Sequence, residues 1–358
     1  MADSDLLRRF LFERWPVRGH FVRLDASWRA VIEHHDYPPV LARTLGEAMA
    51  ATVLVAGTLK FEGRLLMQFQ GPGPVHLMIT ECTDRHAIRG VARHRGELPD
   101  GGTLAGLTGG GQLAVTIDNR RHDTRYQGVV PLTHPGLAAC LEDYFARSEQ
   151  LPTRLVLAAG PDRAAGLLLQ RVATGATASA GEDPRAAEEA DDAWNRIGLL
   201  AATLTPEELL RQPCEAILRR LFNEDDVRLF EGAPVFFQCV CSRERVAGIL
   251  RSLGEAEVRD IVRERGDVEV RCEFCNRAYS FDRIDAARLF AGGSPAGPAP
   301  GVYCAAPGVL DCSPCQHSPQ QRRPPRRPAA PGRRSRCRSS SSCPTTRRWS
   351  RRCGPRSS

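Results

Sequence analysis

The chain has 358 residues, 42% of them hydrophobic and 25% charged, so two folded units plus tails and a sizeable core are expected. The formal net charge of +7 is unevenly distributed: residues 303–358 hold thirteen arginines against one acid, and the first 302 residues carry a net charge of −5. That balance argues against a nucleic-acid-binding body. The single lysine, Lys60, lies outside any glycine-rich phosphate loop, which argues against a P-loop nucleotidase.

No apolar run reaches the roughly 18 residues of a membrane span, and the first ten residues lack the apolar stretch of a signal peptide. We therefore expect a cytoplasmic protein without a membrane partner. Neither a Gly-x-Ser-x-Gly elbow nor a His-Glu-x-x-His helix is present, and no catalytic residue can be named. The sequence does not read as that of an enzyme.

The hydrophobic pattern predicts an α+β protein whose first part, residues 1–174, is an α/β domain with antiparallel sheets around a buried helix. Residues 40–59 are apolar on most faces and predict that central helix. Two further helices are predicted at 25–34 and 136–148, and strands at 21–24, 64–70, 75–80, 87–92, 112–117, 126–132, 153–158 and 165–172.

A linker is expected over residues 175–232. Its first part, 175–192, has the composition of a flexible connector, and helix signals return from Trp194 onward. Thr205 followed by Pro206 predicts a helix N-terminus, and Pro213 predicts the start of another helix. Its single apolar stripe means that this acidic, helical linker folds only against another surface.

Four cysteines dominate the next segment, residues 233–292, as Cys239-x-Cys241 and Cys272-x-x-Cys275. Four soft thiolates at this spacing predict a tetrahedral Zn²⁺ site. Short helices and strands surround the two pairs, with an extended arm at 236–238. Because about sixty residues with so few core positions are marginal alone, metal binding is expected to hold this module folded.

The spacing leaves two interpretations open. A static structural zinc site is the commoner use of four cysteines. A redox switch is favoured by the arginines beside the ligands and by pairs close enough in sequence to form disulfides; these arginines are Arg243, Arg245, Arg271 and Arg277. The isolated Cys82, Cys140 and Cys214 are expected to be buried and reduced.

Several motifs resemble those of the heat-shock protein 33 family, the redox-regulated bacterial holdases. The two that carry the cysteines are Cys239-Val240-Cys241-Ser242-Arg243-Glu244-Arg245 and Cys272-Glu273-Phe274-Cys275-Asn276, followed by Tyr279. Upstream similarity covers Arg18-Gly19, His35-Asp36-Tyr37-Pro38, Thr58-Leu59-Lys60-Phe61, Gln70-Gly71, Arg89-Gly90-Val91-Ala92, Tyr126–Val130 and Cys140–Thr153. Together the resemblance spans roughly residues 5–295.

The resemblance implies a chaperone that is inactive when reduced and bound to one Zn²⁺ through Cys239, Cys241, Cys272 and Cys275. Oxidation would form the disulfides Cys239–Cys241 and Cys272–Cys275, release the zinc and unfold the module and linker. The partners implied are unfolded client proteins and, in the oxidised form, a second copy of the chain, with a monomer in the reduced form.

The remaining features give weaker signals. His34-His35-Asp36 is expected to be a solvated helix end, and Gly109-Gly110-Gly111 a turn. The tail, residues 293–358, is expected to be a disordered extension or frameshift product; Cys312-x-x-Cys315 within it is a poor second knuckle, and no role is predicted for Cys304, Cys337, Cys343 or Cys353. The alternative function is a zinc-stabilised adaptor or nucleic-acid-binding protein that uses this basic tail and a static four-cysteine site.

Overall fold

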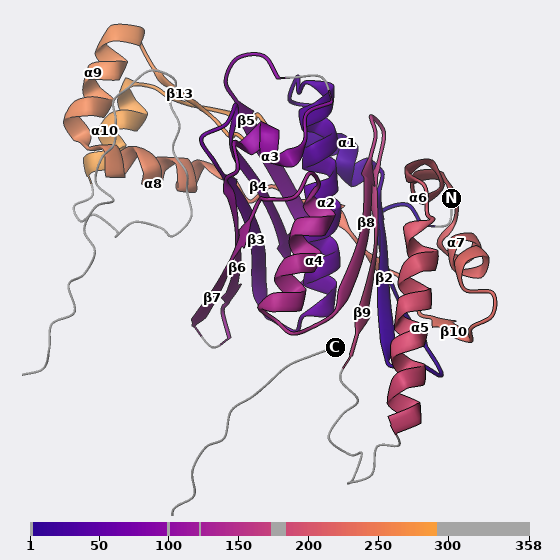
Figure 1. Cartoon of the computed structure of the whole chain (residues 1–358). Coiled ribbons are helices and arrows are strands. Elements are labelled where there is room, and N and C mark those ends of the chain that lie inside the picture. Colours follow the sequence, from indigo (N-terminus) through magenta and orange to yellow (C-terminus); the bar gives the residue numbers. More distant parts are fainter. Residues whose placement is uncertain (1–2, 99–100, 122, 173–183, 292–358) are drawn as a thin grey trace, which may run out of the picture. The chain divides into compact units, whose positions relative to one another are not determined.

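The computed structural model describes residues 3–98, 101–121, 123–172 and 184–291 (Figure 1). The chain divides into two units, Met1–Tyr303 and Cys304–Ser358, and all the described residues lie in the first. The predicted tail and its cysteines therefore lie outside the described residues, as do residues 175–183 of the predicted connector.

The first sheet pairs strands near the N-terminus with strands from residues 153–171 and 227–234. Its strand order is β10-β1-β2-β9-β8, with β11 also paired to β1, and every pairing is antiparallel. The strands are β1 (Leu6–Phe12), β2 (Val17–Leu24), β8 (Thr153–Ala159), β9 (Ala164–Arg171), β10 (Val227–Leu229) and β11 (Ala233–Pro234).

The second sheet has the order β12-β5-β4-β3-β6-β7. Its strands are β3 (Gly63–Gln70), β4 (Val75–Thr83), β5 (Ala87–His94), β6 (Gln112–Asn119), β7 (Thr124–Pro131) and β12 (Phe236–Phe237). Four of the pairings are antiparallel, and β12 is parallel to β5. The sequence predicted the five longer strands to within a few residues at each end.

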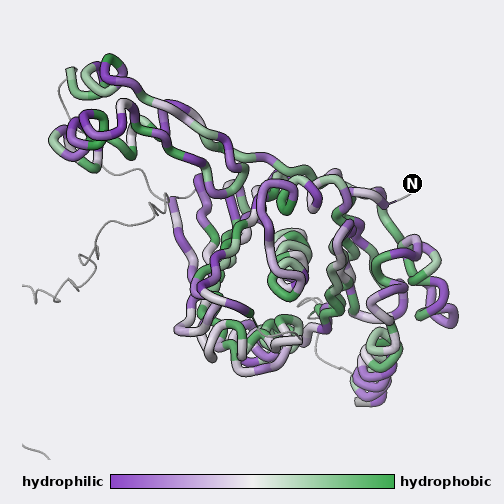
Figure 2. Tube along the Cα trace, turned by 90° about the horizontal axis from the view of Figure 1, so that it is seen from above, coloured by the Kyte–Doolittle hydropathy of each residue, from purple (hydrophilic) through white to green (hydrophobic). Residues whose placement is uncertain are grey.

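Helix α2 (Pro39–Thr58) lies between the two sheets (Figures 1 and 2). It is long and apolar enough to cross a membrane, but 78% of its apolar window is buried inside the protein. Leu41, Leu45 and Leu54 are fully buried in a core that both sheets share. The predicted central helix is therefore confirmed, and three shorter helices accompany it: α1 (Ala26–Ile32), α3 (Leu104–Thr108) and α4 (Leu137–Arg147).

Three helices of the predicted linker pack on the other face of the first sheet. They are α5 (Pro184–Ala202), α6 (Pro206–Arg211) and α7 (Cys214–Leu221). Neighbouring residues of β9 divide between the two faces: Leu168 joins the core around α2, whereas Leu167 and Leu169 join Trp194 and Ile197 of α5 in a second core. The apolar stripe of the predicted linker is thus buried against the first sheet, in agreement with the expectation that this segment folds only against another surface.

The predicted connector needs a correction. Residues 184–192 were expected to be flexible, but they form the first half of α5. Ala186, Ala187 and Ala190 alternate with glutamates, and these are good helix formers, whose propensity here outweighs the polarity of the segment. The predicted helix start at Thr205 is confirmed, because Thr205 and Glu208 form a capping box.

The cysteine-rich segment forms a separate small core. Its elements are α8 (Arg243–Leu253), α9 (Glu255–Arg265), β13 (Val268–Arg271), β14 (Ala278–Phe281) and α10 (Arg283–Ala291). Eight buried residues, among them Leu250, Val258 and Phe281, make up this third cluster, which shares no member with the other two. So small a core agrees with the expectation that the module needs an additional cross-link.

Candidate metal centre

Two arms of the chain carry the four cysteines. Cys239 and Cys241 follow β12 and precede Ser242, whose side chain accepts the backbone N–H of Arg245 and so fixes the start of α8. Cys272 and Cys275 form the turn between β13 and β14. A strand end and a capped helix start thus hold one pair, and a hairpin holds the other.

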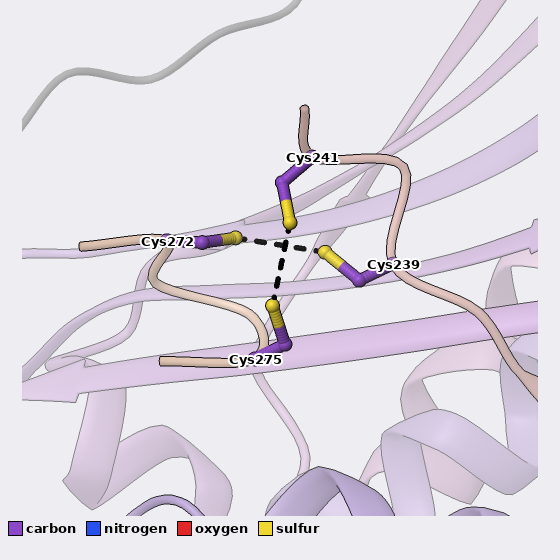
Figure 3. Close-up of side chains that lie close together, drawn as sticks. All are labelled: Cys239, Cys241, Cys272 and Cys275. Atoms are coloured by element: carbon purple, nitrogen blue, oxygen red, sulfur yellow. Dashed lines mark hydrogen bonds between the residues drawn. The ribbon is translucent and has the colours of Figure 1, made fainter. Parts of the chain in front are cut away.

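The four sulfur atoms point toward a common centre (Figure 3). All four Sγ atoms lie within 4.8 Å of one another, and the Sγ–Sγ distances are 3.5 Å for Cys239–Cys272 and 3.4 Å for Cys241–Cys275. A regular tetrahedron with metal–sulfur bonds of about 2.3 Å has edges of about 3.8 Å. The cluster therefore has the size and the donor set of a four-coordinate metal site, and among the described residues it is the one such cluster.

Backbone hydrogen bonds fix the turn between Cys272 and Cys275. The N–H of Cys272 donates to the carbonyl of Arg277 at 2.9 Å, and the N–H of Asn276 donates to the carbonyl of Cys272 at 2.7 Å. Asn276 has a φ of 54°, a left-handed conformation that asparagine tolerates. The knuckle geometry is therefore encoded by the residues after the second cysteine as well as by the cysteines.

The four sulfurs influence one another's protonation through hydrogen bonds. The pKa of Cys272 is lowered to about 4, chiefly because Cys239 donates a hydrogen bond to it, and the same bond raises the pKa of Cys239. Burial raises the pKa of Cys275 to about 11. Cys272 is thus the more acidic partner of this pair, and a bound cation would favour the thiolate form of all four sulfurs.

The four arginines predicted beside the ligands differ in what they contact. Arg277 interacts most directly with the site: its pKa is raised first by a hydrogen bond with Tyr279 and then by the charges of Tyr279 and the cysteines. Arg245 donates to the carbonyl of Val240 at 3.0 Å. By contrast, Arg243 pairs with Asp285 and Arg271 with Glu269, so these two are neutralised by carboxylates.

The knuckle also contacts the edge of the second sheet. The Arg89 guanidinium lies 4.3 Å from the centre of the Phe274 ring, and Arg93 forms an ion pair with Glu273. Sequence reasoning missed both contacts because the partners are about 180 residues apart and no local pattern relates them. They tie the two residues between Cys272 and Cys275 to strand β5.

The other sequence candidates do not join the site. His34 is exposed, and His35 stacks on Tyr37 at 5.0 Å, so the predicted solvated helix end has one half-buried member. Gly109 and Gly110 have φ values of 69° and 71° in the turn that ends α3, as expected. Cys82, Cys140 and Cys214 are buried and free, and burial raises the pKa of each.

Comparison with known proteins agrees with this geometry. The family model described as "Hsp33 protein" matches residues 5–282, a span that contains all four cysteines. The 33 kDa chaperonin of Methylobacillus flagellatus is 46% identical over 291 residues, which cover 81% of this chain and 96% of that protein. The 33 kDa chaperonin of Azotobacter vinelandii is 46% identical over 300 residues, covering 83% and 98%.

A solved structure shares the fold. The crystal structure of the 33 kDa chaperonin, or heat shock protein 33 homolog, of Thermotoga maritima superposes with a TM-score of 0.68 at 24% identity, covering 80% of this chain and 97% of that one. The family match, the curated relatives and this shared fold lead to one conclusion. The chain belongs to the Hsp33 family of 33 kDa chaperonins.

Proposed function

We propose that this protein is a redox-regulated holdase, which binds unfolding proteins under oxidative stress and prevents their aggregation. The observation that carries the proposal is the position of the four-sulfur cluster. Cys239 follows directly after a segment that pairs with both sheets, so the state of the cluster can control how that segment is held.

In the resting state Cys239, Cys241, Cys272 and Cys275 would hold one Zn²⁺. The donor set is wholly thiolate and of tetrahedral size, which suits zinc better than a hard cation such as Mg²⁺. Bound zinc would keep the thiols deprotonated and cross-link the two arms. Much of the folding free energy of the small third core would then depend on the metal.

Activation would follow from oxidation of the cysteines. Each pair of thiolates, Cys239–Cys241 and Cys272–Cys275, would give two electrons to one molecule of peroxide, which takes up two protons from the solvent and is reduced to two molecules of water while one disulfide forms. A sulfur in a disulfide is a poor metal ligand, because the thiolate is the form that binds. Both arms would thereby lose their cross-link.

The effects of zinc release would extend from the cluster toward the N-terminus of the chain. Residues 233–292 would act as the switch, residues 175–232 as the linker that is released, and residues 1–174 as the client-binding and dimerisation domain. The reduced form would be a monomer and the oxidised form a dimer in the bacterial cytoplasm. Reduction of the disulfides in that compartment would restore the thiols and allow the resting state to reform.

The test follows metal, thiols and activity together. Peroxide under mild unfolding stress should release one zinc per chain, remove four thiols at the named positions and switch on suppression of aggregation of a heat-unfolded enzyme. Full suppression by the reduced, zinc-loaded protein would contradict the proposal. A static zinc adaptor would keep its metal and show no suppression in either state.

A matched variant separates the cluster from the other thiols. Cys140→Ala removes a buried thiol outside the cluster and should leave activation unchanged. Cys241→Ser removes one ligand and one member of a proposed disulfide, and should lose both tight zinc binding and its dependence on peroxide.

A further inference from the structure

A single stretch of chain, residues 227–238, supplies an edge strand to both sheets; we call it the strap. Strands β10 and β11 of the strap pair with β1, and β12 pairs with β5. Without the strap, β1 and β5 are the outermost strands of their sheets among the described residues. The strap therefore covers two sheet edges that would otherwise be open.

Hydrogen bonds fix which backbone groups of the two strands face the strap. The N–H of Phe230 donates to the carbonyl of Arg9 at 2.9 Å, and the N–H of Val235 donates to the carbonyl of Asp5 at 2.8 Å. Because bonding directions alternate along a strand, the odd-numbered residues of β1 face the strap and the even-numbered ones face β2.

The same alternation holds at the second edge. The N–H of Phe236 donates to the carbonyl of His86 at 3.2 Å, and the N–H of Gln238 donates to the carbonyl of Ile88 at 3.0 Å. Even-numbered residues of β5 thus face outward, whereas Arg89 and Val91 face β4. At the far end of β5 the outward N–H of Ala92 donates to the Tyr37 hydroxyl at 3.1 Å.

The strands of the strap are short, and most of its side chains are apolar. Its three strands have three, two and two residues, and its charged residues are Arg228 within β10 and Glu231 between β10 and β11. Val235 is 2% exposed and belongs to the core around α2, and Phe237 packs against the same core. The strap is thus held by main-chain bonds and by apolar side chains set into the protein.

Because the strap ends next to Cys239, a change at the cluster can release the strap from the sheets. Phe237 lies two residues before Cys239, so the end of β12 is anchored through the cluster. Short edge strands contribute little stability by themselves, since a few main-chain bonds must offset the ordering of the whole segment. Loss of the anchor would leave the strap held by these short pairings and by the packing of Val235 and Phe237, without the cross-link that fixes its end.

We propose that the edges of β1 and β5, once the strap is released, bind extended apolar segments of unfolded proteins as added strands. The inference rests on the proposed function and names its client-binding surface. The strap itself indicates the ligand: an extended chain whose main chain completes the ladder and whose apolar side chains take the places of Val235 and Phe237. Recognition through the main chain is independent of sequence, which suits a protein that must bind many different clients.

Outward and inward N–H groups alternate along β1 and β5, so amide hydrogen exchange can test the proposal residue by residue. The probe is reduced, carboxymethylated α-lactalbumin, which stays unfolded and has no free thiols. Oxidation should speed exchange at the outward amides that pair with the strap by about tenfold or more, and the probe should slow it again by a similar factor; these amides are Leu7, Leu11 and Ile88. The inward amides of Leu6, Arg8, Phe10, Arg89 and Val91 serve as internal controls and should stay protected throughout.

A peptide pair provides a second test. A peptide with the sequence of residues 227–237 should compete with the probe for the oxidised protein. Its analogue with N-methyl groups at Phe230, Val235 and Phe236 keeps every side chain but loses three of the donors to the sheet edges, and should compete at least about tenfold more weakly.

The outcomes separate this inference from the function on which it rests. If oxidised protein fails to suppress aggregation, the proposed function is wrong. If it suppresses aggregation but the probe does not protect the outward amides, or the methylated peptide competes equally well, clients bind elsewhere and the edge-strand proposal is wrong.

Discussion

The Tyr279 hydroxyl donates a hydrogen bond to Cys241 Sγ at 3.2 Å, which places a neutral donor on one of the four sulfurs. A donor of this kind withdraws electron density from the thiolate and lowers its nucleophilicity. We predict that Tyr279→Phe makes the site more reactive toward peroxide. With a hydrogen bond of about 1 kcal/mol at stake, release of zinc to a coloured chelator should be about fivefold faster.

The control for this prediction is Tyr126→Phe. Tyr126 also donates a hydrogen bond through its hydroxyl, to Glu149 at 2.7 Å, but in the N-terminal part of the chain. That variant should release zinc at the wild-type rate. Equal rates for both variants would show that the Tyr279 bond does not tune the cluster.

The docking of the linker depends on a buried arginine. Arg23 is 6% exposed and donates to the carbonyls of Leu209 and Gln212 at the end of α6. Arg23→Met removes both hydrogen bonds, so the carbonyl groups of Leu209 and Gln212 must find other partners or stay unpaired. We expect the docking of the linker helices on the first sheet to weaken by about 2–4 kcal/mol. Limited proteolysis of the reduced, zinc-loaded protein should then cut the linker faster.

A surface arginine supplies the matched control. Arg147 is 78% exposed and pairs with Asp143 one helical turn away, so Arg147→Met should change stability by less than about 0.5 kcal/mol. Its linker should be cut at the wild-type rate. Equal protease resistance of the Arg23 variant and this control would mean that apolar packing alone holds the linker.

A glutamate in the central helix should make stability depend on pH. Burial raises the pKa of Glu47 to about 7 from an ordinary value of 4.5, with Arg43 partly opposing the shift. Between these values the native state binds the proton more tightly than the unfolded state, so this group lowers stability as pH rises through that window. Below it both states are protonated, and the group contributes nothing.

The measurement compares Glu47→Gln with the wild type by urea unfolding from pH 5 to pH 8. The variant lacks the titration, so its stability advantage should grow by as much as about 3 kcal/mol across that range. A constant difference between the two proteins would show that Glu47 is hydrated in the native state.

The buried thiols should not react with alkylating reagents in the native protein. Cys82 and Cys214 are each 0% exposed, and burial raises the pKa of both. An alkylating reagent, read out residue by residue with mass spectrometry, should modify the four cluster cysteines after chelation of the metal and spare these two. Both should react in 6 M guanidinium chloride, the concentration at which ordinary domains unfold. Early labelling of Cys214 would indicate that α7 opens in the resting state.

The sequence predicted the longer elements because each carries its own pattern. The apolar run of α2 and the strand-like runs of β3 to β7 are local signals, and so is the capping box at Thr205. By contrast, β1 was missed because Arg8 and Arg9 interrupt its apolar residues. The strand is defined by its pairing with β2 and the strap, which lies more than 200 residues away.

The cysteine cluster was predictable for a different reason. Thiolates at knuckle spacing have few uses besides metal binding, so Cys272 and Cys275 indicate the chemistry directly. The contacts that connect the cluster to β5 are long-range, and no spacing within the sequence relates Arg93 to Glu273. What sequence reasoning could not supply was therefore the coupling between the site and the rest of the fold.

The separation of the third core has a calorimetric consequence. Phe237 packs against the main core, whereas the cluster around Leu250 and Val258 shares no residue with it, so the division between two cooperative units falls near Cys239. Heating should produce two endotherms, and a chelator should abolish the smaller one while leaving the larger in place. The cysteine-rich module can thus unfold while the main core stays folded. Regaining the resting state then requires refolding of the module and renewed docking of the linker rather than refolding of the whole protein.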